Sequence, residues 1–430
     1  MRVITISSSG YEEKIKSIHL RTSFINRPEA DTVREIIKDI KNNGNRALLE
    51  YISKYEYPAS LFSDIVVSST EVDLAHARVD DEHLAILQKA INNVRTYHEK
   101  FLLKSWSAPV FQNSSYGMKA TPIRRVGVYV PGGTAVYPST VLMNVIPANV
   151  AGVKEIVLVT PSNKEGKIND MILAAAKELG VTEIYRMGGA QAIGALAFGT
   201  QDLDPVDLIV GPGNIYVTLA KKEVYGVVGI DKLAGPSDIC VIADNLSNPK
   251  YIAADLLAQA EHDNLASAIL ITDSLEQARQ VQKELEIQFS KLDRKEILKQ
   301  VFENNSAIFV VPENDLETIS RLTNLIAPEH LEIFHGNYKE LVQKINNAGA
   351  IFLGEYSAEV LGDYGLGPNH VLPTGGTARF SSPLSAVDFM KTSSIINITK
   401  KDYHELGSDT AKFADLEGLP AHANAARIRL

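Results

Sequence analysis

Apolar residues recur every three or four positions among charged residues in the N-terminal quarter of the chain. Residues 30–53 and 80–103 both show this spacing, which places the apolar side chains on one face of an α-helix. One such face consists of Val33, Ile36, Ile37 and Ile40. The N-terminal quarter is therefore predicted to be mainly helical, with apolar faces that pack on a larger unit.

Residues 105–125 have no clear period and contain Ser, Pro, Gly and Asn, which is typical of a connector into a new region. From residue 126 onward, short β-branched runs alternate with Ala-rich helical segments. The runs are VGVYV at 126–130, EIVLVT at 155–160, EIYRM at 183–187 and VDLIV at 206–210. This alternation of strand and helix predicts a parallel sheet.

The same alternation resumes after Pro236 and predicts a second α/β unit. Its apolar runs are DICVIA, SAILIT, SAIFVV and GAIFLG. The predicted fold class is therefore α/β, with two Rossmann-like parallel-sheet units, a helical N-terminal region and a short helical C-terminal tail.

We divide the chain into four parts on these patterns. Residues 1–25 form an N-terminal segment, and residues 126–237 form an α/β domain with glycine-rich loops. Residues 26–125 are grouped with residues 238–380 in the other α/β domain, in which the helical N-terminal part packs on the second βα unit. Residues 381–430 form the C-terminal helical tail.

The composition changes this picture little but excludes some partners. Hydrophobic residues make up 45% and charged residues 22% of the 430 residues, as in ordinary globular chains. Lys and Arg number 43 against 52 Asp and Glu, which gives a formal net charge of -9. Because nucleic-acid binding normally requires a basic field, we expect no nucleic-acid partner.

The number of cysteines and the apolar runs indicate in which cellular compartment the protein is expected. Cys240 is the only cysteine, which excludes an intrachain disulfide and a Cys-rich zinc site and fits a reducing compartment. Residues 1–17 contain no apolar core of signal-peptide length. The longest charge-free run, 126–153, is interrupted by glycines and three prolines, which argues against a membrane span. We expect a cytoplasmic protein without a membrane partner.

Three glycine-rich loops follow predicted strands, at 131–139, 188–199 and 211–214. Loops beyond the carboxyl ends of parallel strands bind nucleotides in open α/β sheets, because helix N-termini present free N–H groups to phosphate. The alternative is that the glycines only serve tight turns. Three such loops in one unit favour a binding cleft.

The segment LLAQAEHD places Gln259 and His262 three positions apart on a predicted helix, and therefore on one face. An amide oxygen and an imidazole nitrogen can begin a metal site that other segments complete. The alternative is a solvated or capping pair, and the spacing does not decide between the two.

The segment APEHLE contains adjacent Glu329 and His330. Adjacent side chains point in different directions, so they can serve two separate proton transfers. The alternative is a Glu that stabilises a helix start, beside an exposed His. Further polar candidates are Asp363 in GDYGLGPNH, and Glu417 and His422 in EGLPAHA.

Read in order, eight segments between about Val126 and His422 resemble the signature stretches of histidinol dehydrogenase. They are VGVYVPGGTAVYPSTVLMNVIPA, GGAQAIGALAFGT, VGPGN, AGPSD, AADLLAQAEH, APEHLE, GDYGLGPNHVLPT and EGLPAHA. Eight segments in the same order are a specific signature. The N-terminal hundred residues match only in general helical character.

The resemblance implies a zinc enzyme that oxidises L-histidinol to L-histidine through L-histidinal with two NAD, the last step of histidine biosynthesis. On the family pattern the zinc ligands are Gln259, His262, Asp363 and His422. One carboxylate and three neutral ligands leave a net positive site, in which the zinc acts mainly as a template that orients the substrate.

The resemblance also implies roles for further residues. His330 resembles the general base and Glu329 the residue that activates water. The substrate contacts are Ser237, Gln259, His262, His330, Asp363, Glu417 and His422, and the NAD contacts are Tyr129, Gln191 and Asn214. Family members are homodimers in which the tail contributes to the partner's site, but the sequence leaves open whether Glu417 and His422 act in cis or in trans.

Two other functions stay open on the residues alone. One is a zinc hydrolase, in which Glu329 activates metal-bound water and the glycine loops are only turns. The other is a module that holds imidazole ligands on zinc without chemistry. At one position the chain departs from the family pattern, because Ser237 is followed by Asp238 where family members usually have Glu. This difference affects only the expected geometry of the local loop.

Overall fold

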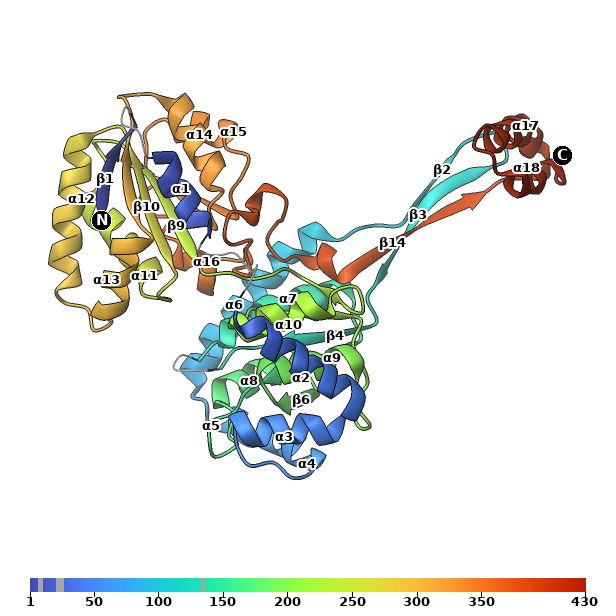
Figure 1. Ribbon diagram of the computed structural model, residues 1–430, viewed down its shortest axis with the longest axis horizontal. Coiled ribbons are helices and arrows are strands. Elements are labelled where there is room, and N and C mark those ends of the chain that lie inside the picture. Colours follow the sequence, from blue (N-terminus) through green and yellow to red (C-terminus); the bar gives the residue numbers. More distant parts are fainter. Residues whose placement is uncertain (7–10, 21–26, 133–135) are drawn as a thin grey trace.

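The structure is a computed structural model that describes residues 1–6, 11–20, 27–132 and 136–430. Two parallel β-sheets with their helices form the body of the molecule, and an antiparallel three-stranded ribbon extends from it (Figure 1). The predicted α/β class with two parallel-sheet units is confirmed.

The first sheet has six parallel strands in the order β1, β11, β10, β9, β12, β13. The strands are β1 (Arg2–Thr5), β9 (Asp238–Ala243), β10 (Ser267–Thr272), β11 (Ala307–Val310), β12 (His330–Ile333) and β13 (Ala350–Leu353). The flanking helices are α1 (Tyr11–Leu20), α11 (Pro249–Ala260), α12 (Leu275–Phe289), α13 (Lys295–Asn304), α14 (Leu316–Ile326) and α15 (Tyr338–Lys344).

The four central strands of this sheet are buried throughout, as expected where helices cover both faces. Alternate side chains of each strand point to opposite faces. One face packs beneath α11, α12 and α13, and the other beneath α1, α14 and α15.

The second sheet has five parallel strands in the order β6, β5, β4, β7, β8. The strands are β4 (Arg125–Tyr129), β5 (Glu155–Thr160), β6 (Glu183–Arg186), β7 (Leu208–Val210) and β8 (Gly229–Ile230). Its own helices are α7 (Pro138–Ala151), α8 (Asp170–Glu178), α9 (Gly189–Phe198) and α10 (Ile215–Val224). Within this sheet β4 comes first in the chain and lies in the middle, and β9 has the same place among β9 to β13 of the other sheet. Apart from the added edge strand β1, both sheets therefore have the same doubly wound order.

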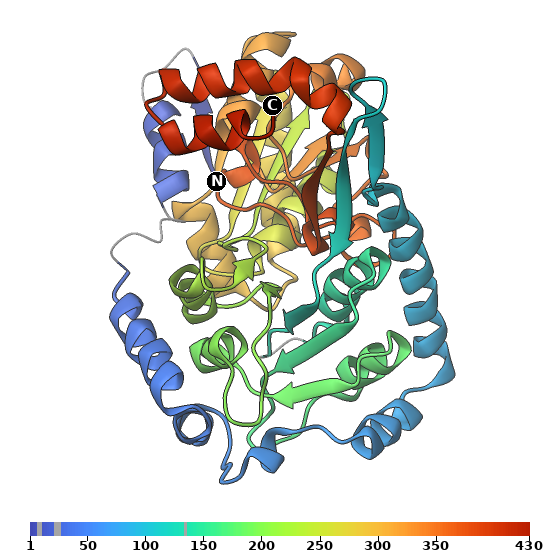
Figure 2. The ribbon, with the colours of Figure 1, turned by 90° about the vertical axis from the view of Figure 1, so that its right-hand side faces the viewer.

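The N-terminal helices pack on the second sheet. They are α2 (Glu29–Asn43), α3 (Asn45–Tyr55), α4 (Phe62–Ile65), α5 (Ser69–Arg78) and α6 (Asp81–His98). The apolar face of α2 lies so close to α9 that a Cβ on Gly194 would be 3.2 Å from Ile37 and 3.3 Å from Ile40. Figure 2 shows these helices (blue) on both sides of the second sheet (green), where α2 and α3 share one core and α5 and α6 the other.

This packing corrects the grouping of residues 26–125 with residues 238–380. An apolar stripe predicts that a helix is covered, but it does not say which sheet covers it. Within the segment 1–25, β1 and α1 join the first sheet, whereas residues 7–10 and 21–25 lie outside the described residues. The other domain boundaries stay a prediction.

The predicted connector at 105–125 contains two strands instead of irregular chain. The central strand β3 (Ser115–Pro122) pairs in antiparallel fashion with β2 (Trp106–Pro109) on one side and with β14 (Met390–Asn397) on the other. The strands of this ribbon contain mostly polar residues and few apolar ones. They therefore lack the regular alternation of apolar and polar residues that predicts a half-buried strand. The short elements nearby are η1 (Glu99–Phe101), α16 (Val360–Tyr364), η2 (Thr377–Arg379) and η3 (Ala386–Phe389).

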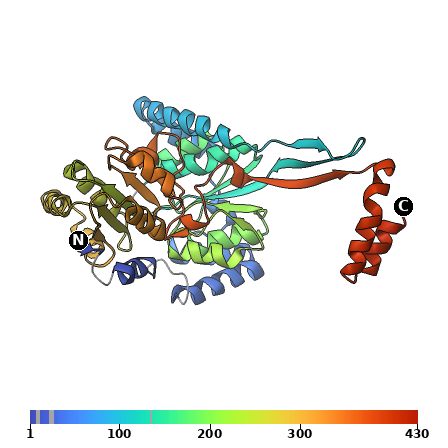
Figure 3. The ribbon, with the colours of Figure 1, turned by 90° about the horizontal axis from the view of Figure 1, so that it is seen from above.

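The C-terminal tail lies at the far end of the ribbon. After β14 the chain forms α17 (Lys400–Leu416) and α18 (Pro420–Arg427), and Tyr403 Oη donates to Ala426 O at 3.0 Å between them. Figure 3 shows the two helices (red) held away from both sheets. In the described part of the chain, no helix combines the length and apolar character that a membrane span needs.

Candidate functional site

Two carboxyl groups join the amino ends of β9 and β12, which are neighbours in the first sheet. Asp238 N donates to Glu329 Oε2 at 3.0 Å, and Glu329 N donates to Asp238 Oδ1 at 2.8 Å. Gly375 N donates to the other oxygen of Asp238 at 3.3 Å. This reciprocal pair holds Glu329, and with it the adjacent His330, at the edge of the sheet. Burial, and then the charge of Asp238, raises the pKa of Glu329 well above its usual range.

His330 is buried as a neutral imidazole. Its Nδ1 lies 3.2 Å from Asp238 O, and because a carbonyl only accepts, Nδ1 carries the proton and Nε2 is the basic nitrogen. Burial, together with the charges of His262 and His370, lowers the pKa of His330 to about 3. A neutral imidazole with a free Nε2 lone pair is suited to accept a proton from a substrate.

Two carboxyl groups face His330, one from Glu359, directly before α16, and one from Asp363, within it. Glu359 and Asp363 lie four positions apart, on one face of the helix, and Glu359 Oε1 is 3.7 Å from His330 Nε2. Nitrogen and oxygen atoms of these three residues all lie within 4.8 Å of one another. Burial and the charge of Asp363 raise the pKa of Glu359 to about 8, and burial raises the pKa of Asp363 to about 6. Such crowding of buried acids favours a bound cation or proton.

Gln259 occupies the last turn of α11 and is fully buried. Neither the oxygen nor the nitrogen of its amide has a hydrogen-bond partner in the described part of the chain. Because a buried amide is normally paired, this orphaned group points to a ligand. The predicted helix ends at Ala260, so His262 follows it in a turn and is not on the helix itself, although its N–H still contacts Gln259 O at 3.4 Å.

Of the four predicted metal ligands, Gln259 and His262 are neighbours at the end of α11, and Asp363 lies in α16 beside His330. Gln259, His262 and Asp363 supply an amide oxygen, an imidazole nitrogen and a carboxylate, a donor set that fits zinc. His262 lies close enough to lower the pKa of both His330 and His370. By contrast, His422 is exposed in α18 at the far end of the ribbon, away from the other three.

Of the remaining predicted substrate residues, Ser237 lies near the site and Glu417 does not. Ser237 directly precedes β9 beside Asp238, and its carbonyl accepts a bond from Ser267 N at 3.0 Å. Glu417 is exposed at the end of α17, on the ribbon with His422. Within one chain, the structure therefore places neither Glu417 nor His422 in the site.

Sequence reasoning missed two residues of this cluster. Glu359 precedes Asp363 by one helical turn, a spacing that would have marked it if the short helix had been expected. His370 lies in the segment GDYGLGPNHVLPT, and its Nδ1 donates to Asp363 O at 3.1 Å. Burial lowers the pKa of His370 to about 4. Its neighbour Asn369 donates to Met143 O at 2.6 Å and so ties this loop to α7 of the second unit.

The predicted NAD contacts gather at the carboxyl edge of the second sheet. Tyr129 ends β4, and its hydroxyl accepts a bond from Gly189 N at 3.2 Å. Gln191 lies in the first turn of α9, and Asn214 caps α10 by accepting bonds from Tyr216 N and Val217 N. Gly133, Thr134 and Ala135 of the first glycine loop lie outside the described residues.

The sequence predicts free N–H groups at the N-termini of the helices that follow the glycine loops, but several of these groups in α9 and α10 are bonded. Gly188 N donates to Glu56 Oε1 at 2.9 Å, and the first N–H groups of α10 are bonded to Asn214. The N–H groups of Gly188, Tyr216 and Val217 are therefore already bonded within the protein and are not free for phosphate. Tight packing explains other glycines of these loops, since a Cβ on Gly132 would lie 2.4 Å from Pro161 Cγ.

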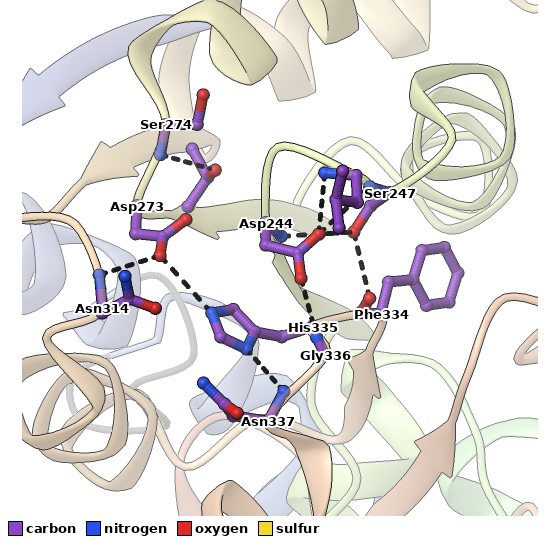
Figure 4. A network of polar contacts seen from close by, with 11 residues as sticks. Asp244, Ser247, Asp273, Ser274, Asn314, Phe334, His335, Gly336 and Asn337 are labelled. Atoms are coloured by element: carbon purple, nitrogen blue, oxygen red, sulfur yellow. Dashed lines mark hydrogen bonds and ion pairs between the residues drawn. The ribbon is translucent and has the colours of Figure 1, made fainter.

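The carboxyl edge of the first sheet is closed by internal hydrogen bonds (Figure 4). Asp244 Oδ2 accepts a bond from Gly336 N at 2.7 Å, and Asp273 Oδ2 accepts one from Asn314 N at 3.0 Å. His335 Nδ1 accepts a bond from Asn337 N at 3.0 Å. Because these side chains bond to one another's loops, this edge is less suited to a nucleotide than the edge of the second sheet.

Comparisons with known proteins agree with this arrangement. The family profile described as histidinol dehydrogenase matches residues 21–430. The histidinol dehydrogenase of Bacillus licheniformis is 50% identical over 97% of this chain and 99% of its own length. That of Bacillus subtilis is 48% identical over 100% of this chain and 99% of its own length. The crystal structure of histidinol dehydrogenase from Elizabethkingia anophelis is 38% identical, with a TM-score of 0.92 over 100% of this chain and 98% of that one.

The chain belongs to the histidinol dehydrogenase family. The resemblance drawn from eight sequence segments is therefore confirmed, and so is the assignment to the oxidoreductases. The comparisons cover the N-terminal hundred residues as well, for which the sequence alone indicated only helical character.

A buried pair of acids lies behind the site of this dehydrogenase. Glu332 follows His330 by two positions in β12, is fully buried, and accepts a bond from Glu359 N at 2.9 Å. Burial and the charge of Asp255 raise the pKa of Glu332 to about 9. Asp255 lies one helical turn before Gln259 in α11. The pair therefore connects β12, α11 and α16, the three elements on which the site residues lie, and its burial favours the protonated form of Glu332.

Replacing Glu332 by Gln should stabilise the metal-free protein more at pH 8 than at pH 5. The pKa of Glu332 is about 9 when folded against an ordinary value of 4.5, so unfolding releases a proton between these values. Stability is therefore lost as the pH rises through that window, and Glu332→Gln avoids this loss. Urea unfolding midpoints at the two pH values measure the difference. The exposed Glu313→Gln serves as the control, and an equal effect of Glu332→Gln at both pH values would contradict the assignment.

Proposed function

We propose that this chain oxidises L-histidinol to L-histidine through L-histidinal, with two NAD⁺ as hydride acceptors, in the cytoplasm and as the last step of histidine biosynthesis. The proposal rests mainly on the buried amide of Gln259, which has no hydrogen-bond partner among the described residues. The buried His330, with its lowered pKa, and Glu359, with its raised pKa, support it. A structural core would pair these groups with one another, whereas a site for a cation and a polar substrate leaves them available.

Zinc fits the donor atoms of this cluster. Gln259, His262 and Asp363 would hold it, with His422 as the fourth protein ligand. Bound there, zinc supplies a positive charge and a template for the imidazole and amine nitrogens of histidinol. The nearby positive charge would also favour the ionised forms of Asp363 and Glu359, whose pKa values are raised in its absence.

The first oxidation needs a base. The alcohol carbon transfers a hydride to NAD⁺ while the hydroxyl loses its proton, which gives the aldehyde and NADH. His330 Nε2 is positioned to take that proton, because Nδ1 is already committed to Asp238 O. Its lowered pKa keeps the imidazole neutral and ready to accept.

The second oxidation needs water. Water adds to the aldehyde carbonyl, and the resulting hydrate loses a hydride to a second NAD⁺ and a proton to the protein. Glu329 lies beside His330 and uses Oε2 to accept the bond from Asp238 N, which leaves Oε1 to orient water. Its raised pKa makes the ionised carboxylate a stronger base toward that water. The two oxidation steps therefore use different side chains as the base.

NAD⁺ is assigned to the carboxyl edge of the second sheet. Tyr129, Gln191 and Asn214 converge there from β4, α9 and α10, at the point where the strand order reverses around β4. Lys232, which follows β8 of the same sheet, donates to Val371 O at 3.1 Å. The segment after His370 thus contacts the second unit, while its Gly375 contacts Asp238 of the first.

We also propose a homodimer in which the tail of one copy completes the site of the other. The ribbon holds α17 and α18 away from their own body, so His422 and Glu417 serve a site only if that site belongs to another subunit (Figure 3). Large apolar side chains on the tail are exposed in the single chain, as expected for a surface that a second copy covers. They are Phe413, Leu416, Leu419 and Ile428.

The direct test is to add NAD⁺ and histidinol to the purified protein and to follow the absorbance of reduced nicotinamide. Two NADH per histidinol are expected, and the activity should disappear after prolonged chelation and return with zinc. A zinc hydrolase or a binding module would produce no NADH. Retained activity in verified metal-free protein would refute the zinc requirement.

Glu329→Gln should slow aldehyde oxidation much more than alcohol oxidation, whereas His330→Ala should impair both. Only the second half-reaction consumes water, and general acid–base catalysis typically contributes about 10² to 10⁴-fold. Supplying histidinol and histidinal in separate single-turnover assays measures each half. Equal losses in both halves for Glu329→Gln would mean that this carboxyl group has another role.

Mixing chains that carry His422→Ala with chains that carry His330→Ala should restore activity. Each variant alone is expected to be inactive, but in a heterodimer with exchanged tails one site has both histidines. The control is to mix His330→Ala with a chain that carries both substitutions, which leaves every site without its base. Activity measured after subunit exchange should stay absent in the control. Inactive but verified heterodimers in the test mixture would show that the tail acts in cis.

A further inference from the structure

Glu56 reaches the glycine loop of α9 from outside both sheets. It directly follows α3, in the N-terminal helical region, and its Oε1 accepts bonds from Gly188 N at 2.9 Å and from Gln191 Nε2 at 3.0 Å. Gly188 is the residue before α9, and Gln191 is one of the proposed NAD contacts. The carboxylate therefore touches the cofactor edge directly.

The second oxygen of Glu56 is an acceptor without a donor. Oε2 is buried and has no hydrogen-bond partner among the described residues, and no ion pair is recorded for Glu56 in that part of the chain. Burial is the main cause that raises the pKa of this carboxyl group, while the two N–H bonds at Oε1 lower it. An unsatisfied buried oxygen costs free energy, which a hydroxyl donor from a ligand would recover.

Glu56 lies where a doubly wound dinucleotide site usually has an acidic residue. In doubly wound dinucleotide sites, an acid near the end of the strand beside the central one binds a ribose hydroxyl. That strand here is β5, which ends in Thr160 and continues with Pro161 and Ser162, without an acid. Gly188 lies against Pro161, since a Cβ on it would be 2.8 Å from Pro161 Cβ. Glu56, bonded to Gly188 N, thus brings a carboxylate from a distant helix to the end of β5.

We propose that Glu56 selects a dinucleotide with a free ribose 2′-hydroxyl: its unpaired Oε2 accepts the bond from this hydroxyl, and its charge repels a 2′-phosphate. The inference rests on the proposed binding of NAD⁺ at this edge. A 2′-phosphate would meet a carboxylate that no cation accompanies, so NADP⁺ loses the hydroxyl bond and gains a repulsion. Glu56 is therefore a specificity residue for the cofactor, supplied by the N-terminal helices.

The test compares ADP-ribose with its 2′-phosphorylated form as competitive inhibitors against NAD⁺. In Glu56→Gln the side-chain shape is kept, but an amide replaces the carboxylate. Binding of ADP-ribose should weaken about tenfold, as for the loss of one hydrogen bond to a charged group, while binding of the 2′-phosphate form should not weaken. The selectivity between the two inhibitors should therefore fall at least tenfold. The matched control is the exposed Glu50→Gln on α3, which should leave both inhibition constants unchanged.

The ratio of the two inhibition constants does not depend on how much of a variant is folded, so partial unfolding cannot imitate the result. An unchanged ratio in Glu56→Gln, including an equal weakening of both inhibitors, would overturn the proposal, because Glu56 would then only position the loop. Failure of ADP-ribose to compete with NAD⁺ in the unaltered protein would instead overturn the proposed cofactor site itself. The two failures are thus distinguishable.

Discussion

The parallel pairing of β9 with β12 is the constraint on which the site depends. It brings two amino ends together, so that Asp238 and Glu329 can each accept the other's backbone N–H. The same pairing places His330 with Nδ1 on the carbonyl of Asp238 and Nε2 toward α16. If the register slipped by one residue, His330 would point to the opposite face of the sheet.

Burial then determines the chemistry of the groups that this pairing positions. Removing imidazoles and carboxyl groups from water disfavours their charged forms, so burial lowers the pKa values of His330 and His370 and raises those of Glu359 and Glu332. Such a cluster is costly as a structural core, because several of its polar atoms have no partner in the described chain. A cation and a polar substrate would supply those partners. The unpaired groups that destabilise the empty cluster are therefore the ones that would bind these ligands.

Apart from β1, the two sheets share a strand order, but the proposed site uses opposite edges of them. The second sheet offers its carboxyl edge, with Tyr129, Gln191 and Asn214, as doubly wound sheets commonly do. The first sheet offers its amino edge, while loop bonds around Asp244 and His335 close its carboxyl edge (Figure 4). Topology alone therefore does not locate the chemistry, and the side chains at each edge decide it.

The pattern of residues predicted most of the helices and strands of the two sheets and the fold class, and eight ordered segments indicated the family, but the strands of the ribbon and the short helix α16 were missed. The predicted properties depend on short-range periodicity and on the order of motifs, which the chain carries directly. Only the tertiary structure showed that the N-terminal helices cover the second sheet, that Glu359 and His370 join His330, and that the ribbon carries His422 and Glu417 away from their own body. The physical reason is that an apolar stripe or a polar residue specifies burial or chemistry but not a partner, because its partner lies in a distant segment that only the packed fold brings near.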